Sequence, residues 1–236
     1  MTVRKWLSRA RRLIRWNPVG DLPAFAQLSW AQEAEDLLLV SLHEQMPPRS
    51  RFYVDVGAHH PQRFSNTWLF YQQGWRGINI DPVPGVMDEF NRVRPRDINL
   101  EVAISDRVGT ARFFIFDETA VSTMSDSLAK EREEETPYRI TTELDVPTRT
   151  LTSVLEEHQP PGDLIDFMTV DVEGHELKVV RSLDWTRWRP TFLLIEALDA
   201  EDAHADLVAE TIAEIGYRRV VQTPRTVFYR DRFAKR

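Results

Sequence analysis

The feature that most constrains the fold is an alternation of short apolar runs with segments of helical spacing. The apolar runs are FYVDVGA (52–58), GINIDP (77–82), IDFMTVDVEG (165–174) and TFLLIEA (191–197). Apolar, β-branched runs that stop at glycine or proline are typical of strands buried on both faces of a sheet. Helical spacing occurs at 65–74, 86–93, 151–158 and 176–183. This order predicts an α/β protein with a doubly wound, mostly parallel sheet that helices cover on both faces.

Two pairs of predicted strands follow each other with only a turn between them. The runs at 218–223 and 226–231 come after a helical segment. They predict an antiparallel hairpin at the edge of the sheet, because parallel neighbours need a longer crossover. The runs at 99–106 and 111–117 are separated by a turn that contains Gly109, and they predict a second hairpin.

The length of 236 residues suits one medium-sized domain with small additions. We expect a basic and helical extension over residues 1–50 and the main domain over residues 51–236. Residues 118–148 are polar and rich in Ser, Thr and Glu, which predicts an insertion or lid over the site. The charge run at 130–135 predicts a solvated helix face.

Composition excludes several classes of protein. The absence of cysteine excludes disulfide frameworks, thiolate metal sites and cysteine nucleophiles, and it agrees with a reducing compartment. No stretch approaches the roughly 20 apolar residues that span a bilayer. The net charge of −7 argues against nucleic acid as a partner, because phosphate binding needs clustered Lys and Arg. We therefore expect a globular protein of the cytoplasm.

Residues 1–16 form a basic amphipathic segment. It has six basic residues and no acidic residue, and its apolar residues recur at helical spacing. Such a helix can lie on the anionic inner surface of a membrane, with Trp and Leu inserted and Arg facing phosphate. It can equally be a terminal helix that frays or packs on the domain. It lacks the continuous apolar core of a secretory signal, so we do not expect export by that route.

Acidic residues mark the ends of four predicted strands. They are Asp55, Asp81, Asp171 with Glu173, and Glu196. The carboxyl ends of parallel strands meet at one edge of a sheet, where open α/β sheets bind their ligands. Burying a carboxylate is costly unless it meets a ligand, a metal or hydrogen-bond donors. We therefore expect these side chains to line one polar site.

The turn after the first strand limits which cofactor this site can bind. A carboxylate at the end of the second strand, such as Asp81, can accept both hydroxyls of a ribose, which indicates a nucleoside-bearing cofactor. Dinucleotide sites need the pattern G-x-G-x-x-G, whose amides hold a pyrophosphate. Residues 57–62 are GAHHPQ, with one glycine and a proline that lacks an amide proton. A cofactor with a ribose but no phosphate, such as S-adenosylmethionine, is therefore favoured.

Several motifs together resemble one known family. VDVGAHHPQRFSNT, GINIDP, EVAISD and TVDVEGHELKVV followed by LLIEA are similar, in order and spacing, to the FkbM family of S-adenosylmethionine-dependent methyltransferases. The resemblance spans residues 52–197. It implies a class I methyltransferase fold with a Rossmann-like, seven-stranded sheet, and O-methylation of a sugar, glycan, glycolipid or related natural product. The family's VDVGAN-x-G is VDVGAHHP here, so the contacts of that Asn and second Gly are not carried over.

The resemblance also assigns residues to the cofactor. They are Asp55, Gly57, Ala58, Ser65, Asn66, Asp81, Ala103, Ile104 and Ser105. Asp55 and Gly57 would approach the methionine end, Asp81 would hold the ribose, and residues 103–105 would border the adenine. Ser65, Asn66 and Thr67 begin a helix that faces the cleft and would bind the cofactor carboxylate, although Ser65 can equally be a helix cap.

Methyl transfer needs a positioned acceptor and benefits from a base, because a hydroxyl is a poor nucleophile while it is protonated. The candidates are Asp171, Glu173 and His175. Asp171 is the preferred base and a candidate metal ligand, and His175 is the alternative base unless it only caps the next helix. His60 and Glu196 would contact the acceptor, or Glu196 would pair with an arginine. Mg²⁺ suits such carboxylates, but no dense ligand motif is present, so the metal requirement stays open.

Two other functions stay open at this stage. An NAD(P)-dependent oxidoreductase or sugar epimerase would use Asp81 in the same way, although the missing glycines and the lack of a Tyr-x-x-x-Lys pair count against it. A non-catalytic binding module on this fold is the second alternative.

Overall fold

A computed structural model describes residues 23, 25–197 and 203–234 of the chain. The basic segment over residues 1–16 lies outside the described residues, so its predicted helix is not tested. No helix in the described part of the chain combines the length and the apolar character needed to cross a bilayer.

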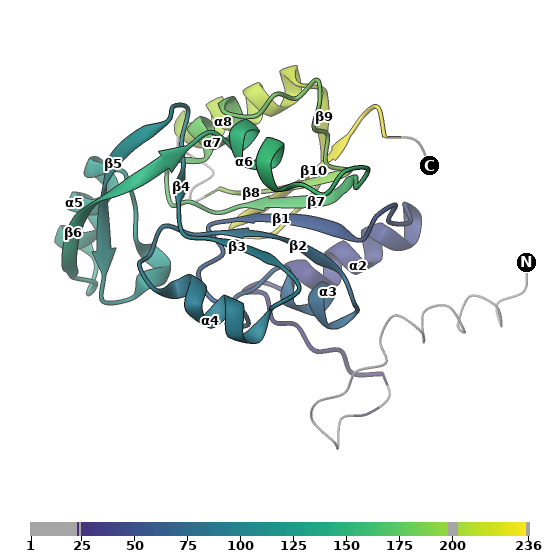
Figure 1. Cartoon of the computed structure of the whole chain (residues 1–236), viewed down its shortest axis with the longest axis horizontal. Helices are drawn as coiled ribbons and strands as arrows, with labels where there is room; N and C mark the ends of the chain where they lie inside the picture. Colours follow the sequence, from purple (N-terminus) through teal and green to yellow (C-terminus); the bar gives the residue numbers. More distant parts are fainter. Residues whose placement is uncertain (1–22, 24, 198–202, 235–236) are drawn as a thin grey trace, which may run out of the picture.

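The centre of the molecule is a seven-stranded sheet with the strand order β3-β2-β1-β7-β8-β10-β9 (Figure 1). Its strands are β1 (Phe52–Val56), β2 (Arg76–Ile80), β3 (Ile98–Leu100), β7 (Ile165–Val170), β8 (Phe192–Glu196), β9 (Tyr217–Gln222) and β10 (Thr226–Asp231). Strands β3, β2, β1, β7 and β8 are parallel, whereas β10 runs antiparallel to β8 and β9. The predicted class I methyltransferase architecture with its C-terminal antiparallel hairpin is therefore confirmed.

Helices cover both faces of this sheet (Figure 1). One side carries α2 (Glu35–Gln45), α3 (Trp68–Gln72) and α4 (Val86–Val93), and the other carries α6 (Leu151–His158), α7 (Glu176–Arg181) and α8 (Ala203–Glu214). Side chains of a strand alternate between faces, so Val54 and Val56 pack with α6, α7 and α8 while Tyr53 packs with α2 and α3. Both faces are apolar, which explains the continuous apolar runs.

A second, three-stranded sheet lies beside the main sheet (Figure 1). It consists of β4 (Ala103–Ile104), β5 (Gly109–Phe116) and β6 (Ile140–Arg149), and the turn η1 (Thr119–Val121) and helix α5 (Asp126–Glu135) connect β5 to β6. The predicted insertion over residues 118–148 therefore contains η1, α5 and most of β6. Its function as a lid stays a prediction.

The predicted hairpin between residues 99–106 and 111–117 is wrong. Residues 98–100 belong to the main sheet, and residues 103–104 cross to the second sheet. There β6 pairs antiparallel with β5 along its whole length and parallel with β4. The ten-residue β6 offers β5 a full-length partner, which the two residues of β4 cannot, so a distant segment displaces the neighbouring one.

Candidate functional site

A cavity of about 410 Å³ lies at the carboxyl edge of the main sheet. Its walls come from the loops after β1, β2 and β7, from the end of β8, from the second sheet with α5, and from the start of α2. Asp55, Asp81, Asp171 and Glu196 all line it, so the strand-end acids share one cavity. Small-molecule pockets typically measure about 300–1,000 Å³, and this cavity is within that range.

Most of the residues predicted for the site line this cavity. They are Asp55, Gly57, Ala58, Ser65, Asn66, Asp81, Ala103, Ile104, Asp171, Glu173 and Glu196. Ser65 also caps α3, because its Oγ accepts a hydrogen bond from the amide of Trp68. Thr67 does not line the cavity, and its Oγ1 donates to Asp55 Oδ2.

His60, Ser105 and His175 do not line the cavity. The Nδ1 atom of His60 accepts hydrogen bonds from the next turn of the chain, and Ser105 Oγ donates to the Asp106 carboxylate. His175 is buried at the start of α7. Because these side chains point elsewhere, we do not carry them into the proposed reaction.

His59 is a cavity residue that the sequence did not single out. It stands where the family motif has Asn, and its backbone has a φ of 50°, in the left-handed region. This conformation lets the His59 amide donate to Asp81 Oδ2 at 2.8 Å. Burial, followed by the charge of Arg63, lowers the pKa of His59 to about 4, so the ring is neutral near pH 7.

Glycine is the only residue type that position 57, in the turn after β1, can accept. The φ of Gly57 is 84°, and a Cβ atom there would collide with the backbone of Asp171. The Gly57 amide also donates to the carbonyl of Ile80, the last residue of β2. The turn therefore joins the ends of three adjacent strands at the floor of the cavity.

Asp81 follows β2 and has both carboxylate oxygens fixed by backbone amides. Oδ2 accepts from His59 and Oδ1 accepts from Val83 at 2.9 Å. Burial raises the pKa of Asp81 to about 6, although these two hydrogen bonds favour the ionised form. Each oxygen keeps a second lone pair, so the carboxylate can still accept hydrogen bonds from a ligand.

Three carboxyl groups meet at the end of β7 and β8. Asp171, Glu173 and Glu196 each offer an oxygen within 4.8 Å of the others. Desolvation, followed by the charge of Glu173, raises the pKa of Asp171, although Asp171 is exposed on the cavity side. Burial and then the charge of Asp171 raise the pKa of Glu196 well above its usual value as well. The pKa of Asp171 reaches about 8, so this acidic pair binds protons near neutral pH.

Arg132 brings a positive charge to this cluster from helix α5. It lies in the charge run of α5, but its side chain is buried and donates to Glu173. The prediction of a fully solvated helix face is therefore wrong at this position. Thr123 Oγ1 also donates to the Glu173 carbonyl at 2.7 Å, and Glu173 has a left-handed φ of 53°. These contacts attach the insertion to the end of β7.

The donor set does not favour Mg²⁺. Carboxylate oxygens suit this ion. Here, however, Arg132 already forms an ion pair with Glu173, one of the three carboxylates that could act as ligands. No step of the proposed reaction is therefore routed through a metal.

The extension that precedes the main domain also contributes to the cavity. Gln32, which precedes α2, and Glu35, the first residue of α2, line it. Thr226 Oγ1 donates to Glu35 at 3.1 Å, and the Arg225 amide donates to Glu33. No local pattern predicts this contribution, because the two contacts join residues 191 and 192 positions apart in the chain.

Arg63 and Glu118 form an ion pair at the rim of the cavity. The Nη2–Oε2 distance is 2.7 Å, and the pair joins the loop after β1 to the segment after β5. Both side chains are partly exposed. Neither residue is among those that the sequence predicts for the site.

A second cavity, of about 480 Å³, lies next to the first and shares Glu196 with it. Its polar lining consists of Ser125, Ser127, Glu131, Glu176, Glu196 and His204. Neither Lys nor Arg lines it in the described part of the chain. It therefore offers acceptors and hydroxyls but no Lys or Arg cation.

A family model described as the methyltransferase FkbM domain matches residues 55–219 of the chain. A comparison with curated proteins found no match.

Among solved structures, the O-methyltransferase TomG from Streptomyces achromogenes, in complex with SAM, is 13% identical with a TM-score of 0.44. That match covers 94% of this chain and 86% of TomG. A DUF574 family protein from Streptomyces avermitilis is also 13% identical, with a TM-score of 0.36 and coverage of 84% and 80%.

Proposed function

Because the chain belongs to the FkbM methyltransferase family, we propose that it transfers a methyl group from S-adenosylmethionine to a hydroxyl oxygen of a sugar, glycan, glycolipid or related natural product. The observation that carries the proposal is the position of Asp81. Its carboxylate lines the cavity with both oxygens fixed by amides. The adjacent turn has a proline and one glycine where a pyrophosphate would need amides.

Different parts of the first cavity suit different parts of the cofactor. Asp81 would accept hydrogen bonds from the ribose, and Asp55 with the Gly57 turn would face the amino-acid end. Ala103, Ile104 and other apolar side chains of the lining would contact the adenine. When bound, S-adenosylmethionine supplies an electrophilic methyl group on a sulfonium.

Asp171 is the proposed general base. An acceptor hydroxyl beside it would lose its proton to Asp171 as its oxygen bonds to the methyl carbon and the bond between that carbon and sulfur breaks, with S-adenosylhomocysteine as the leaving group. Burial raises the pKa of Asp171 to about 8, close to the pH at which a general base is most effective, and Arg132 neutralises the neighbouring Glu173. Positioning of the acceptor would supply much of the remaining rate acceleration.

The second cavity is the proposed entry for the acceptor. It meets the first cavity at Glu196, and its lining has carboxylates and serine hydroxyls without Lys or Arg among the described residues. Such a surface accepts hydrogen bonds from neutral hydroxyls and repels phosphate or carboxylate groups. This supports a hydroxylated acceptor over an anionic one.

Isothermal titration of the full chain with S-adenosylhomocysteine and with NAD⁺ tests the proposal. We expect S-adenosylhomocysteine to bind, Asp81→Ala to abolish binding, and the exposed Asp88→Ala on α4 to leave it unchanged. Binding of NAD⁺ alone would favour the oxidoreductase alternative, and binding of neither would refute the proposed cofactor.

Mass spectrometry of glycans, lipids and small metabolites, with and without the protein in the cell, tests the acceptor. We expect species heavier by one methyl group that disappear with Asp171→Ala. Full cellular function of Asp171→Ala would instead support the non-catalytic alternative.

A further inference from the structure

The largest fully buried side chain of the described residues is that of Arg94, beside the cofactor cavity but not in its lining. Arg94 directly follows α4. Its guanidinium makes hydrogen bonds to five groups of three different segments, which a merely space-filling residue would not need. A buried cation is costly unless its charge is balanced and its N–H donors have acceptors. The partners of Arg94 therefore indicate its function.

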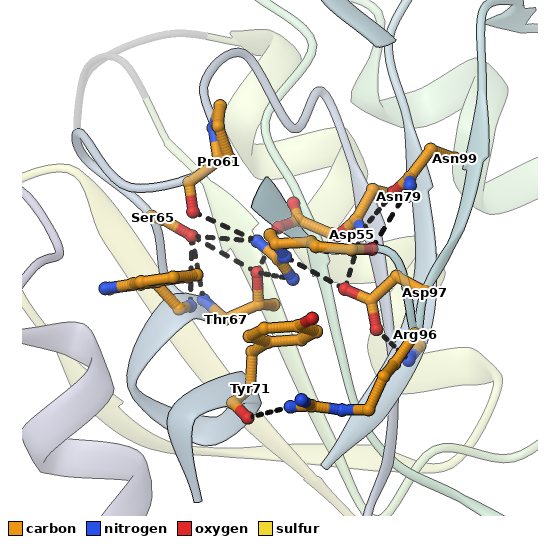
Figure 2. A network of polar contacts seen from close by, with 12 residues as sticks. Asp55, Pro61, Ser65, Thr67, Tyr71, Asn79, Arg96, Asp97 and Asn99 are labelled. Atoms are coloured by element: carbon orange, nitrogen blue, oxygen red, sulfur yellow. Dashed lines mark hydrogen bonds and ion pairs between the residues drawn. The ribbon is translucent and has the colours of Figure 1, made fainter. Parts of the chain in front are cut away.

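Arg94 contacts the loop that forms one wall of the cavity. Nη1 donates to the Pro61 carbonyl and to Ser65 Oγ, both at 3.4 Å, and Nη2 donates to Thr67 Oγ1 at 3.0 Å. In Figure 2 these three groups converge on one point from the loop between β1 and α3. The same loop contributes Ser65 and Asn66 to the lining of the cavity.

The guanidinium also sets the direction of the hydrogen bonds around it. It is donor-only, so Thr67 Oγ1 must accept from Arg94 and has its own proton left to donate. That proton goes to Asp55 Oδ2, at 2.7 Å. Asp55 keeps its other oxygen for the cavity that it lines.

Asp97 completes the charge balance on the far side of Arg94. Arg94 Nε donates to Asp97 Oδ2 at 2.9 Å, and both side chains are fully buried. Tyr53 accepts from Arg94 Nη2 and donates to Asp97, each at 2.7 Å, and Asn79 donates to Asp97 as well. Figure 2 shows Asp97 and Asn79 on the side of the network away from Ser65.

We propose that Arg94 is a positioning residue for cofactor binding: through Thr67 it fixes the Asp55 carboxylate, and through Pro61 and Ser65 it fixes the adjacent wall of the cavity. The inference rests on the proposed function, because it requires that the cofactor binds beside Asp55. A cofactor with a cationic ammonium group would gain most from an ionised, fixed Asp55.

Thr67→Val and Thr67→Ser in the full chain test this inference without removing a buried charge. Valine keeps the shape of threonine and loses the hydroxyl that links Arg94 to Asp55, whereas serine keeps the hydroxyl. We expect Thr67→Val to weaken S-adenosylhomocysteine binding about tenfold or more and Thr67→Ser to restore most of it. Arg96→Met is the matched control, because Arg96 donates to the Tyr71 carbonyl and not to the loop.

The pH profile of binding separates positioning from a purely structural function. The charged or titratable groups that face Asp55 are Arg94, Asp97, Asp81 and Asp171. All of them remain in Thr67→Val, so a change in the profile reports on Asp55. We expect the acidic limb of the binding profile to move to higher pH in Thr67→Val, because ionised Asp55 loses a donor.

Two outcomes would overturn the inference while leaving the proposed function intact. One is a Thr67→Val variant that binds S-adenosylhomocysteine as tightly as the wild type. The other is that Thr67→Val and Thr67→Ser lower the melting temperature and the affinity to the same extent, and that Thr67→Val leaves the pH profile of binding unchanged. Failure of the wild type to bind would instead refute the proposed function.

Discussion

A Cβ atom on Gly57 would lie 1.6 Å from the backbone carbonyl oxygen of Asp171. The turn proposed to hold the cofactor and the strand end proposed to hold the base are therefore in direct backbone contact. No side chain can be placed between them unless one of the two segments moves.

Gly57→Ala should destabilise the protein by roughly 4 kcal/mol or more, since a backbone clash adds to the cost of a positive φ. Gly162→Ala is the control, because Gly162 has a φ of 86° and no atom lies within 4 Å of the point that its new methyl group would take. Gly162→Ala should lower the free energy of unfolding by only about 1–2 kcal/mol. Urea unfolding of both variants measures the difference, and equal losses would contradict the prediction.

Asp81→Asn should weaken S-adenosylhomocysteine binding by about 10- to 100-fold. Both Asp81 oxygens accept from backbone amides, so an amide nitrogen in place of either oxygen would face a donor. Titration calorimetry measures the effect. An affinity within about threefold of the wild type would remove Asp81 from the ribose site.

Ionisation of Asp55 should destabilise the cofactor-free protein as the pH rises. Burial raises the pKa of Asp55 to about 6, so the folded state binds more protons than the unfolded state between about pH 4 and about pH 6. The contribution of Asp55 to the free energy of unfolding is fully present below about pH 4. It is lost as the pH rises to about 6 and above, by an amount on the order of 3 kcal/mol. Denaturation of wild type and Asp55→Asn as a function of pH isolates the effect, because the difference between them should vary with pH.

Asp171→Asn should lower turnover by about 100-fold or more and leave cofactor affinity nearly unchanged, as expected for the loss of a base. Methyl transfer from labelled S-adenosylmethionine into cell extract measures turnover. His175→Gln should have little effect, because His175 does not line the cavity. A reversal of these two results would make His175 the base.

Arg132→Met should destabilise the protein by about 3–5 kcal/mol, since it leaves the Glu173 carboxylate buried without its partner. The exposed Lys130→Met on the same helix is the control. The double variant Arg132→Met, Glu173→Gln should recover part of the loss, because it buries no unpaired charge. Additive losses in a double-mutant cycle would show that the pair is uncoupled.

Local patterns in the amino-acid sequence are enough to predict the layers of this protein and the position of its site. The apolar runs predicted strands buried on both faces, and Asp55, Asp81, Asp171 and Glu196 marked the carboxyl edge where the cavity lies. These features are local, because the residues of a strand and the residue that ends it are neighbours in the chain.

The distant residues that complete the site become visible only in the folded chain. The pairing of β5 with β6, the entry of Arg132 into the cavity, and the network of Arg94 with Thr67 and Asp97 all join separate segments. In the sequence, Arg132 is one member of a charge run and Arg94 one basic residue among several. Whether such a charge is solvated or buried depends on register and packing between elements, which no local pattern encodes.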